Sequence, residues 1–279
     1  MAASVGDALR SATEWLRASG SRSPRLDAEL LLATALGVDR TELFRAPERV
    51  LTRGEERRFD GYLVRRQARE PVAYIRGHRA FRSIELEVTP AVLIPRPETE
   101  TLVDAALEVL AAVPEAGAVA LGSYEPLALD VGTGSGCIAL ALAAENPFVR
   151  LVATDVSEAA LEVARRNAAR LGLVGRVDIR QGDLLDDLPP RERFDLVVSN
   201  PPYIPAAEYR SLEPNVRDYE PRLALHGGVL AVEVGAGQAA AVRVLFAAAG
   251  AFEPARERAD LAGIPRVVFA RLAARDLGA

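Results

Sequence analysis

An apolar run that ends in Asn-Pro-Pro-Tyr is the part of this sequence best suited to chemistry. The run "FDLVVSN" stops at Asn200, and Pro201, Pro202 and Tyr203 follow it. Because proline fixes its own φ and has no N–H, this pair holds the backbone rigid just beyond a strand. The Asn200 side-chain carbonyl and the Pro201 backbone carbonyl can accept both hydrogens of a planar NH₂ group, and Tyr203 can pack on its face. The motif predicts a site for an amide or amino nitrogen; the alternative is a proline-rich turn that merely ends the strand.

A glycine-rich turn lies upstream of this motif. The segment "LDVGTGSGCIA" follows an apolar strand and opens a helix. Glycine lets the backbone approach a ligand closely at the N-terminus of a helix. The spacing alone is equally typical of a dinucleotide site or a tight turn. We expect a ligand to contact the loop residues Gly132, Thr133, Gly134, Ser135 and Gly136.

Three aspartates at strand ends indicate which ligand the loop favours. Asp130, two positions before the first glycine, would repel a pyrophosphate and suits a cation. Asp155 ends the next strand, where a carboxylate can accept both ribose hydroxyls of an adenosine. Asp183, followed by Leu184, comes after the third strand and can accept from an adenine amino group. Asp155 and Asp183 could instead cap the helices that follow. Together they favour S-adenosylmethionine, which has a sulfonium, an ammonium and no phosphate, over NAD.

These two motifs predict an in-line transfer of the sulfonium methyl group to an amide or amino nitrogen. An amide nitrogen is a poor nucleophile, so we expect positioning and electrostatics to supply most of the rate. Nothing near Asn200 is an obvious general base, and we expect the proton to leave to solvent after transfer.

The elements that must position these residues alternate along the chain. Apolar strands alternate with helical segments after about Leu127, which predicts an α/β fold with a parallel sheet and helices on both faces. The strands are expected at "LALDVG", "RLVATD", "RVDIRQGD", "FDLVVSN", "VLAVEVG" and "RVVFARL". Residues up to about Glu70 show helical periodicity and predict a small bundle. Between the two parts, Ala80–Ile94 alternates and predicts a β-hairpin that turns at Thr89-Pro90.

Composition excludes several classes of protein. The chain has 279 residues, is 49% hydrophobic and has a net charge of −5, which argues against nucleic-acid binding by bulk electrostatics. Its one cysteine, Cys137, rules out an internal disulfide and suits a reducing compartment. With only His78 and His226 besides, we expect no metal site. An apolar stretch of membrane-spanning length and a secretory signal are both absent. We therefore expect a cytoplasmic protein, and a monomer because no long apolar heptad is present.

The motifs resemble a known family. "NPPY" together with "DVGTGSG" resembles the class I S-adenosylmethionine-dependent methyltransferases that act on planar nitrogens. The segment "EPVAYIRGHRAFRSIELEVTPAVLIPRPETE" resembles the joining segment of the release-factor glutamine methyltransferases, the PrmC/HemK family. "VRDYEPRLAL" and "VEVGAGQ" are similar to the same family, so the resemblance covers nearly the whole chain.

This resemblance implies methylation of the glutamine N5 in the Gly-Gly-Gln motif of class 1 peptide chain release factors. It implies a Rossmann-like, mostly parallel seven-stranded sheet, with residues 1–72 as a helical substrate-recognition domain, 73–96 as a hairpin linker and 97–279 as the catalytic domain. The loop glycines, Asp155 and the Asp183-Leu184 pair would bind S-adenosylmethionine, and Asn200 to Tyr203 would hold the substrate amide. The partner would be the release factor, without direct contact to nucleic acid or membrane. "IPRPETE" would brace the cleft or serve only as a linker and helix start.

The sequence departs from the family before the fifth strand. "ALHGG" is followed directly by "VLAVEVG", as if two glycine pairs had been fused and the helix between them lost. A parallel crossover needs a dozen or more residues, and those available contain several prolines, so we expect poor cover of one side of the sheet there. Two other functions stay open: an amino-methyltransferase acting on a nucleic-acid base, and a degenerate methyltransferase fold that only binds translation factors.

Overall fold

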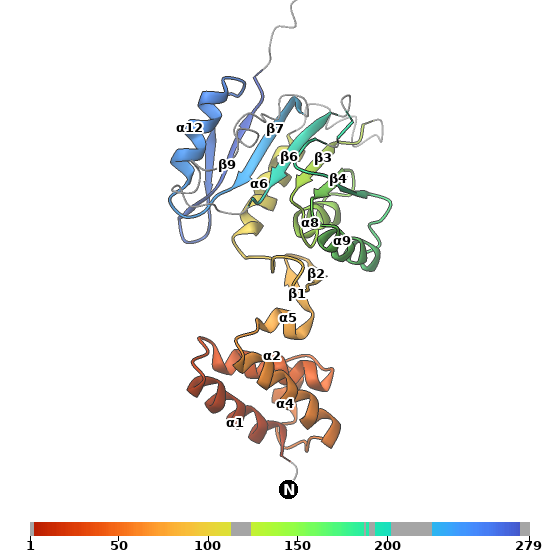
Figure 1. The fold of residues 1–279 in the computed structure, drawn as a ribbon, viewed down its shortest axis with the longest axis vertical. Helices are drawn as coiled ribbons and strands as arrows, with labels where there is room; N and C mark the ends of the chain where they lie inside the picture. Colours follow the sequence, from red (N-terminus) through yellow and green to blue (C-terminus); the bar gives the residue numbers. More distant parts are fainter. Residues whose placement is uncertain (1–2, 113–123, 187, 190–192, 202–224, 274–279) are drawn as a thin grey trace, which may run out of the picture. The chain divides into compact units, whose positions relative to one another are not determined.

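A computed structural model describes residues 3–112, 124–186, 188–189, 193–201 and 225–273 (Figure 1). The chain divides into two compact units. The first consists of Met1–Arg79 with Val88–Pro90, and the second of Ala80–Glu87 with Ala91–Ala279. Each unit has its own hydrophobic core, and the two are described separately.

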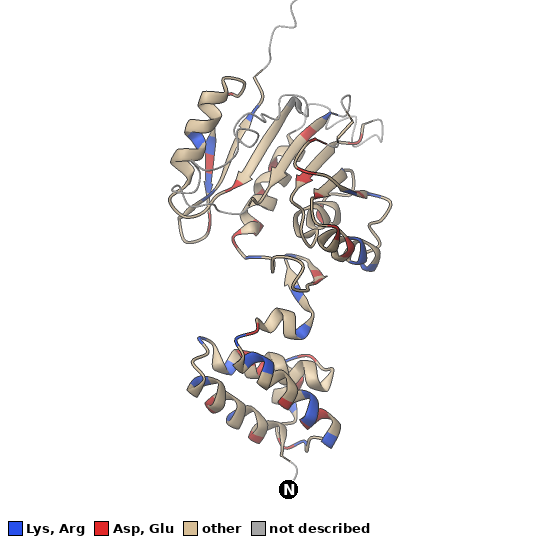
Figure 2. Ribbon diagram, in the orientation of Figure 1, with Lys and Arg blue, Asp and Glu red and all other residues tan. Residues whose placement is uncertain are grey.

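The first unit is a bundle of short helices. Its helices are α1 (Val5–Ala18), α2 (Pro24–Leu36), α3 (Glu42–Arg45), α4 (Arg53–Gln67) and α5 (Val72–Arg76). Helix α4 begins with a capping box, because the Thr52 hydroxyl accepts from the Glu55 N–H while the Glu55 carboxylate accepts from the Thr52 N–H. Leu16, Leu31 and Phe59 are buried where the helices meet. Basic and acidic residues are interspersed along these helices in the view of Figure 2.

The hairpin is present, but it lies earlier in the chain than the sequence predicts. Its strands are β1 (His78–Phe81) and β2 (Ile84–Glu87), so the turn is at Arg82-Ser83 and the prediction of a turn at Thr89-Pro90 is wrong. Arg82 adopts a left-handed conformation with φ +50°. Its guanidinium is held at 2.7 Å by both Glu145 and Asp104. These ion pairs stabilise a turn that a local propensity for glycine or proline does not reveal.

The second unit contains a seven-stranded sheet in the order β5-β4-β3-β6-β7-β9-β8. The first five strands in this order are parallel, and the last two run antiparallel to their neighbours. This confirms the predicted Rossmann-like, mostly parallel sheet. The strands are β3 (Leu127–Val131), β4 (Arg150–Asp155), β5 (Val177–Gln181), β6 (Phe194–Ser199), β7 (Leu225–Glu233), β8 (Arg256–Ala259) and β9 (Pro265–Arg271).

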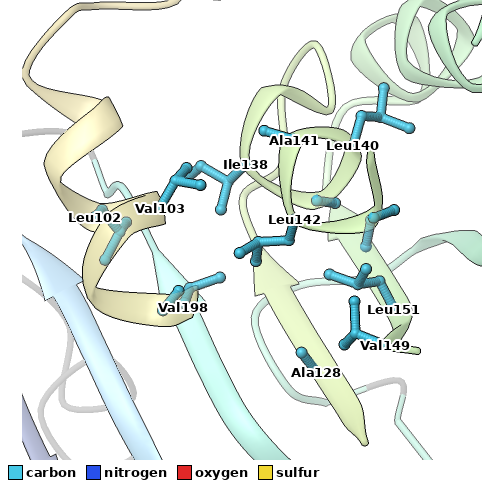
Figure 3. Close-up of a cluster of buried hydrophobic side chains, with 14 of the residues drawn as sticks. Leu102, Val103, Ala128, Ile138, Leu140, Ala141, Leu142, Val149, Leu151 and Val198 are labelled. Atoms are coloured by element: carbon cyan, nitrogen blue, oxygen red, sulfur yellow. The ribbon is translucent and has the colours of Figure 1, made fainter. Parts of the chain in front are cut away.

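Helices cover both faces of this sheet, as predicted. The helices are α6 (Thr99–Ala111), α8 (Cys137–Glu145), α9 (Glu158–Arg170) and α12 (Ala239–Ala249). Alternate strand residues point to opposite faces, and Ala128, Leu196 and Val198 pack in one cluster with α6, α8 and α9 on the first face. Figure 3 shows side chains of α6 and α8 pointing toward these strands. Val268 and Ala270 pack with α12 on the second face. Within the described ranges, each helix is too short or too polar to span a bilayer.

Strand β7 starts four residues before the predicted fifth strand and includes the glycine pair. Phe194 pairs with Leu225 and Leu196 pairs with Val229, so β7 has two more residues than β6 between these pairs. This irregularity brings Gly228 against β6: an added Cβ would lie 2.5 Å from the Phe194 carbonyl oxygen and 2.7 Å from that of Asp195. Only glycine fits this close contact, and Gly228 therefore lets β7 begin upstream of the predicted strand. The prediction that one side of the sheet is poorly covered here concerns residues 202–224, which lie outside the described residues.

Candidate functional site

The carboxyl ends of β3, β4 and β6 meet where the strand order reverses. β3 lies between the other two, and its last residue, Val131, pairs with Thr154 on β4 and with Ser199 on β6. The segments that follow these strands therefore leave the sheet side by side, carrying Asp155 on one flank of the glycine loop and Asn200 on the other. Such a switch point is where open α/β sheets bind ligands.

The glycine loop is held in shape by its own backbone hydrogen bonds. Its three glycines have φ values of +72°, +57° and +82°, which only glycine adopts readily. The N–H groups of Gly132 and Thr133 both donate to the Thr154 carbonyl at 2.9 Å, and the Gly136 N–H donates to the Thr133 carbonyl at 2.9 Å. The Gly134 N–H donates to the Asp155 carboxylate at 2.9 Å. Four N–H groups of the loop are thus engaged within the protein and are not free to bind a phosphate.

Asp130 is fully buried beneath the loop. Its carboxylate accepts from the Thr133 hydroxyl at 2.6 Å and from the Ala139 N–H, in the first turn of α8, at 3.2 Å. The other carboxylate oxygen is buried without a partner among the described residues. Asp130 therefore caps α8 from inside the protein and makes this helix end unfavourable for an anion. Thr133 and Ser135 are buried as well, so their side chains support the loop.

Burial raises the pKa of Asp130 to about 6, although the hydrogen bonds from Thr133 and Ala139 partly offset the effect. The folded protein therefore binds this proton more tightly than the unfolded chain does. The stability that this bound proton adds to the folded protein is fully present below pH 3.8 and is lost as the pH rises through about 6. Asparagine does not titrate. We expect Asp130→Asn to gain stability relative to the wild type between pH 4 and 7.5, by up to about 3 kcal/mol in the free energy of unfolding.

Urea denaturation at several pH values measures this difference. Asp178→Asn removes a carboxylate that is 60% exposed on β5 and serves as the matched control. Parallel pH profiles for the wild type and Asp130→Asn would contradict the raised pKa.

Asp155 organises two loops at once. One carboxylate oxygen accepts from the Gly134 N–H and the other from the Ser157 N–H, both at 2.9 Å. Helix α9 is capped by Ser157, whose hydroxyl accepts from the Ala160 N–H at 3.3 Å. The alternative that Asp155 is the helix cap is therefore wrong. Each carboxylate oxygen can accept a second hydrogen bond, so ribose binding by Asp155 stays a prediction.

Asp183 and Leu184 lie just beyond β5, and both are exposed. Leu184 has a φ of +52° and is 47% exposed, an unusual combination for an apolar residue. Strained and exposed apolar residues of this kind cluster at ligand sites. The role of both residues in adenine binding stays a prediction.

Asn200 lies directly after β6 and is half-buried. The preceding residue, Ser199, donates its hydroxyl to the Val131 carbonyl at 2.9 Å, which ties the end of β6 to the start of the glycine loop. The Asn200 side-chain amide donates to the Thr99 hydroxyl at 3.1 Å. Pro201 is exposed, and Pro202 and Tyr203 lie outside the described residues. The structure thus brings Asn200, Asp155 and the glycine loop together at one edge of the sheet.

Asn167 of α9 is a buried residue that belongs to neither of the two sequence motifs. Its side-chain oxygen accepts from the Glu87 N–H at 2.6 Å, and its amide donates to the carbonyls of Glu87 and Ser135, both at 3.0 Å. It is fully buried and links the end of the hairpin to the glycine loop. The sequence does hold a signal: Asn167 follows Ala160 and Ala164 at helical spacing, so it is a polar residue on the apolar face of α9.

Two family models match the chain. The PrmC N-terminal domain model matches residues 7–77, and the methyltransferase small domain model matches residues 103–235. A release factor glutamine methyltransferase from Caulobacter vibrioides is 43% identical, with 94% of each chain covered. One from Bradyrhizobium diazoefficiens is 40% identical, with 96% of this chain and 95% of the relative covered. The chain belongs to the release factor glutamine methyltransferase family.

Other members of this family carry residues that have no counterpart here. The alignment with the Bradyrhizobium relative runs over 290 positions, more than the 279 residues of this chain. Among solved structures, the human methyltransferase 10 domain containing protein is 16% identical with a TM-score of 0.50, covering 66% of this chain and 87% of the other. That likeness shows the fold alone.

Proposed function

We propose that this protein transfers the methyl group of S-adenosylmethionine to the side-chain amide nitrogen (N5) of the glutamine in the Gly-Gly-Gln motif of class 1 peptide chain release factors. The observation that carries the proposal is the pairing of Val131 with Ser199. It sets the glycine loop, which would bind the donor, beside Asn200, which would bind the acceptor. The names of the relatives, release factor glutamine methyltransferases, support the choice of acceptor.

The loop suits a cationic donor better than a dinucleotide. Four of its N–H groups are bonded within the protein, and Asp130 places a carboxyl group below it. A pyrophosphate would meet few free donors and a nearby carboxyl group, whereas a sulfonium and an ammonium are compatible with both. Asp155 would accept from the ribose hydroxyls, and Asp183 with Leu184 would contact the adenine. Gly132 and Gly134 have open space where a Cβ would point, so a ligand can approach the backbone there.

The acceptor residues hold a planar carboxamide rather than deprotonate it. The Asn200 oxygen and the Pro201 carbonyl would accept the two hydrogens of the glutamine NH₂ and aim its lone pair at the methyl carbon. The new bond joins nitrogen and carbon, the sulfur–carbon bond breaks, and the sulfonium becomes a neutral thioether. The nitrogen then loses one proton to water. Pro202 would stiffen the turn, and Tyr203 would pack on the amide.

Different segments of the chain would recognise the release factor and transfer the methyl group. We assign release factor recognition to the helical residues 1–72, the joining role to 73–96 and methyl transfer to 97–279. The match of the PrmC N-terminal domain model to residues 7–77 supports this division.

Transfer of labelled methyl groups to a purified class 1 release factor tests the function. The wild-type release factor should be labelled, and one in which the glutamine of Gly-Gly-Gln is replaced by glutamate should not, because it lacks the acceptor nitrogen. Equal labelling of both factors would exclude this glutamine as the target, and labelling of neither would exclude the activity.

A further inference from the structure

Thr99, the first residue of α6, makes a contact that helix formation does not require. The residue is 1% exposed, and its hydroxyl accepts a hydrogen bond from the Asn200 amide nitrogen at 3.1 Å. The N-cap residue of α6 is Glu98, whose side chain makes no cap bond, and among the described residues the Thr99 hydroxyl bonds to Asn200 instead. Thr99 belongs to "IPRPETE", for which the sequence leaves a structural and a functional role open.

The orientation of the Asn200 amide decides whether it can bind the acceptor. An asparagine side chain carries an oxygen that only accepts and an NH₂ group that only donates. To accept a hydrogen from the substrate NH₂ group, the oxygen must face the substrate, and the Asn200 nitrogen must then face α6. In that orientation the nitrogen needs an acceptor, and the Thr99 hydroxyl is the one the structure supplies.

The remaining contacts fix where this amide sits. The Ser199 hydroxyl bonds to the Val131 carbonyl and holds the backbone before Asn200 against β3. On the other side, the Thr99 N–H donates to the Arg96 carbonyl at 3.1 Å, and Asp104 of α6 binds Arg82 at 2.7 Å. The amide is thus held between a strand end and a helix start that are anchored separately.

We propose that Thr99 is a positioning residue for methyl transfer: by accepting from the Asn200 amide nitrogen, its hydroxyl holds this side chain in the place from which its oxygen can bind the acceptor amide. The inference rests on the proposed function. Thr99 needs no contact with either substrate; it acts through Asn200. Removing its hydroxyl leaves the productive orientation with an unpaired donor, and that lowers the turnover number about tenfold.

Valine and serine at position 99 separate the hydroxyl from the shape of the side chain. Thr99→Val keeps the shape and removes the hydroxyl, and we expect about tenfold slower transfer with S-adenosylmethionine affinity within about twofold of the wild type. Thr99→Ser keeps the hydroxyl and should stay within about threefold of the wild-type turnover. In an Asn200→Ala background, Thr99→Val should cause no further loss, because the group it positions is gone.

Several results would overturn the inference. These are unchanged turnover in Thr99→Val, equal losses in the valine and serine variants, or a full tenfold loss by Thr99→Val in the Asn200→Ala background. If Thr99→Val does not fold, as judged by its melting temperature, Thr99→Ala takes its place in the same cycle with Asn200. Failure of the wild-type protein to methylate the release factor would instead refute the proposed function, so the two failures are distinguishable.

Discussion

Asn200→Ala is expected to slow methyl transfer by about 10²–10³-fold while leaving S-adenosylmethionine affinity within about twofold of the wild type. The alanine removes the oxygen that would accept from the glutamine NH₂ group, so the acceptor loses its orientation but the donor loop keeps its contacts. Single-turnover rates with labelled donor give the first quantity, and calorimetry with the donor gives the second.

Asn146→Ala is the matched control, because Asn146 ends α8 at the opposite end from the glycine loop. It should transfer methyl groups at the wild-type rate. If Asn200→Ala were as active as this control, the assignment of Asn200 to the acceptor would be wrong.

Asp155→Ala is expected to weaken S-adenosylmethionine binding by about 100-fold. The substitution removes the acceptor for the Gly134 and Ser157 N–H groups, so the loop loses its brace in addition to the predicted ribose contact. Calorimetric titration measures the affinity. At saturating donor, turnover should recover to within about threefold of the wild type, because the acceptor site is unchanged.

Asp178→Ala, on the neighbouring strand β5, removes a carboxylate that pairs with Arg180 and should bind the donor normally. Wild-type affinity in Asp155→Ala would mean that the donor lies elsewhere. The two variants at Asn200 and Asp155 should thus fail in opposite ways, one in turnover and one in affinity.

The sheet and the glycine loop could be predicted because their signals are local. Most of the parallel strands contain a short apolar run, and the loop glycines need positive φ values that few other residues adopt. The antiparallel edge strand β8 could not be predicted in this way. Its sequence, Arg-Glu-Arg-Ala, has no apolar face, because it is an edge strand with mostly exposed side chains.

The hairpin was misplaced for a related reason. Thr89-Pro90 is a strong turn signal in the sequence, whereas the turn in the structure depends on Arg82 and its partners Glu145 and Asp104. These partners are far away in the sequence, so no local pattern contains them. The same holds for the bond between Thr99 and Asn200, which are 101 positions apart. Local patterns therefore do not contain the long-range contacts that hold such residues in place.

The close fit of Gly228 against β6 limits where the chain can change its length. β6 cannot move aside easily, because the Asp195 carboxylate accepts from the Tyr124 hydroxyl at 2.5 Å and from the Leu127 N–H at 2.9 Å. β7 is equally fixed there, since the Gly228 carbonyl accepts from the Leu272 N–H at 2.9 Å. Residues grafted from a longer relative would therefore have to enter upstream of Leu225. Any larger residue at position 228 would collide with the backbone of β6 and disrupt the pairing of β6 with β7.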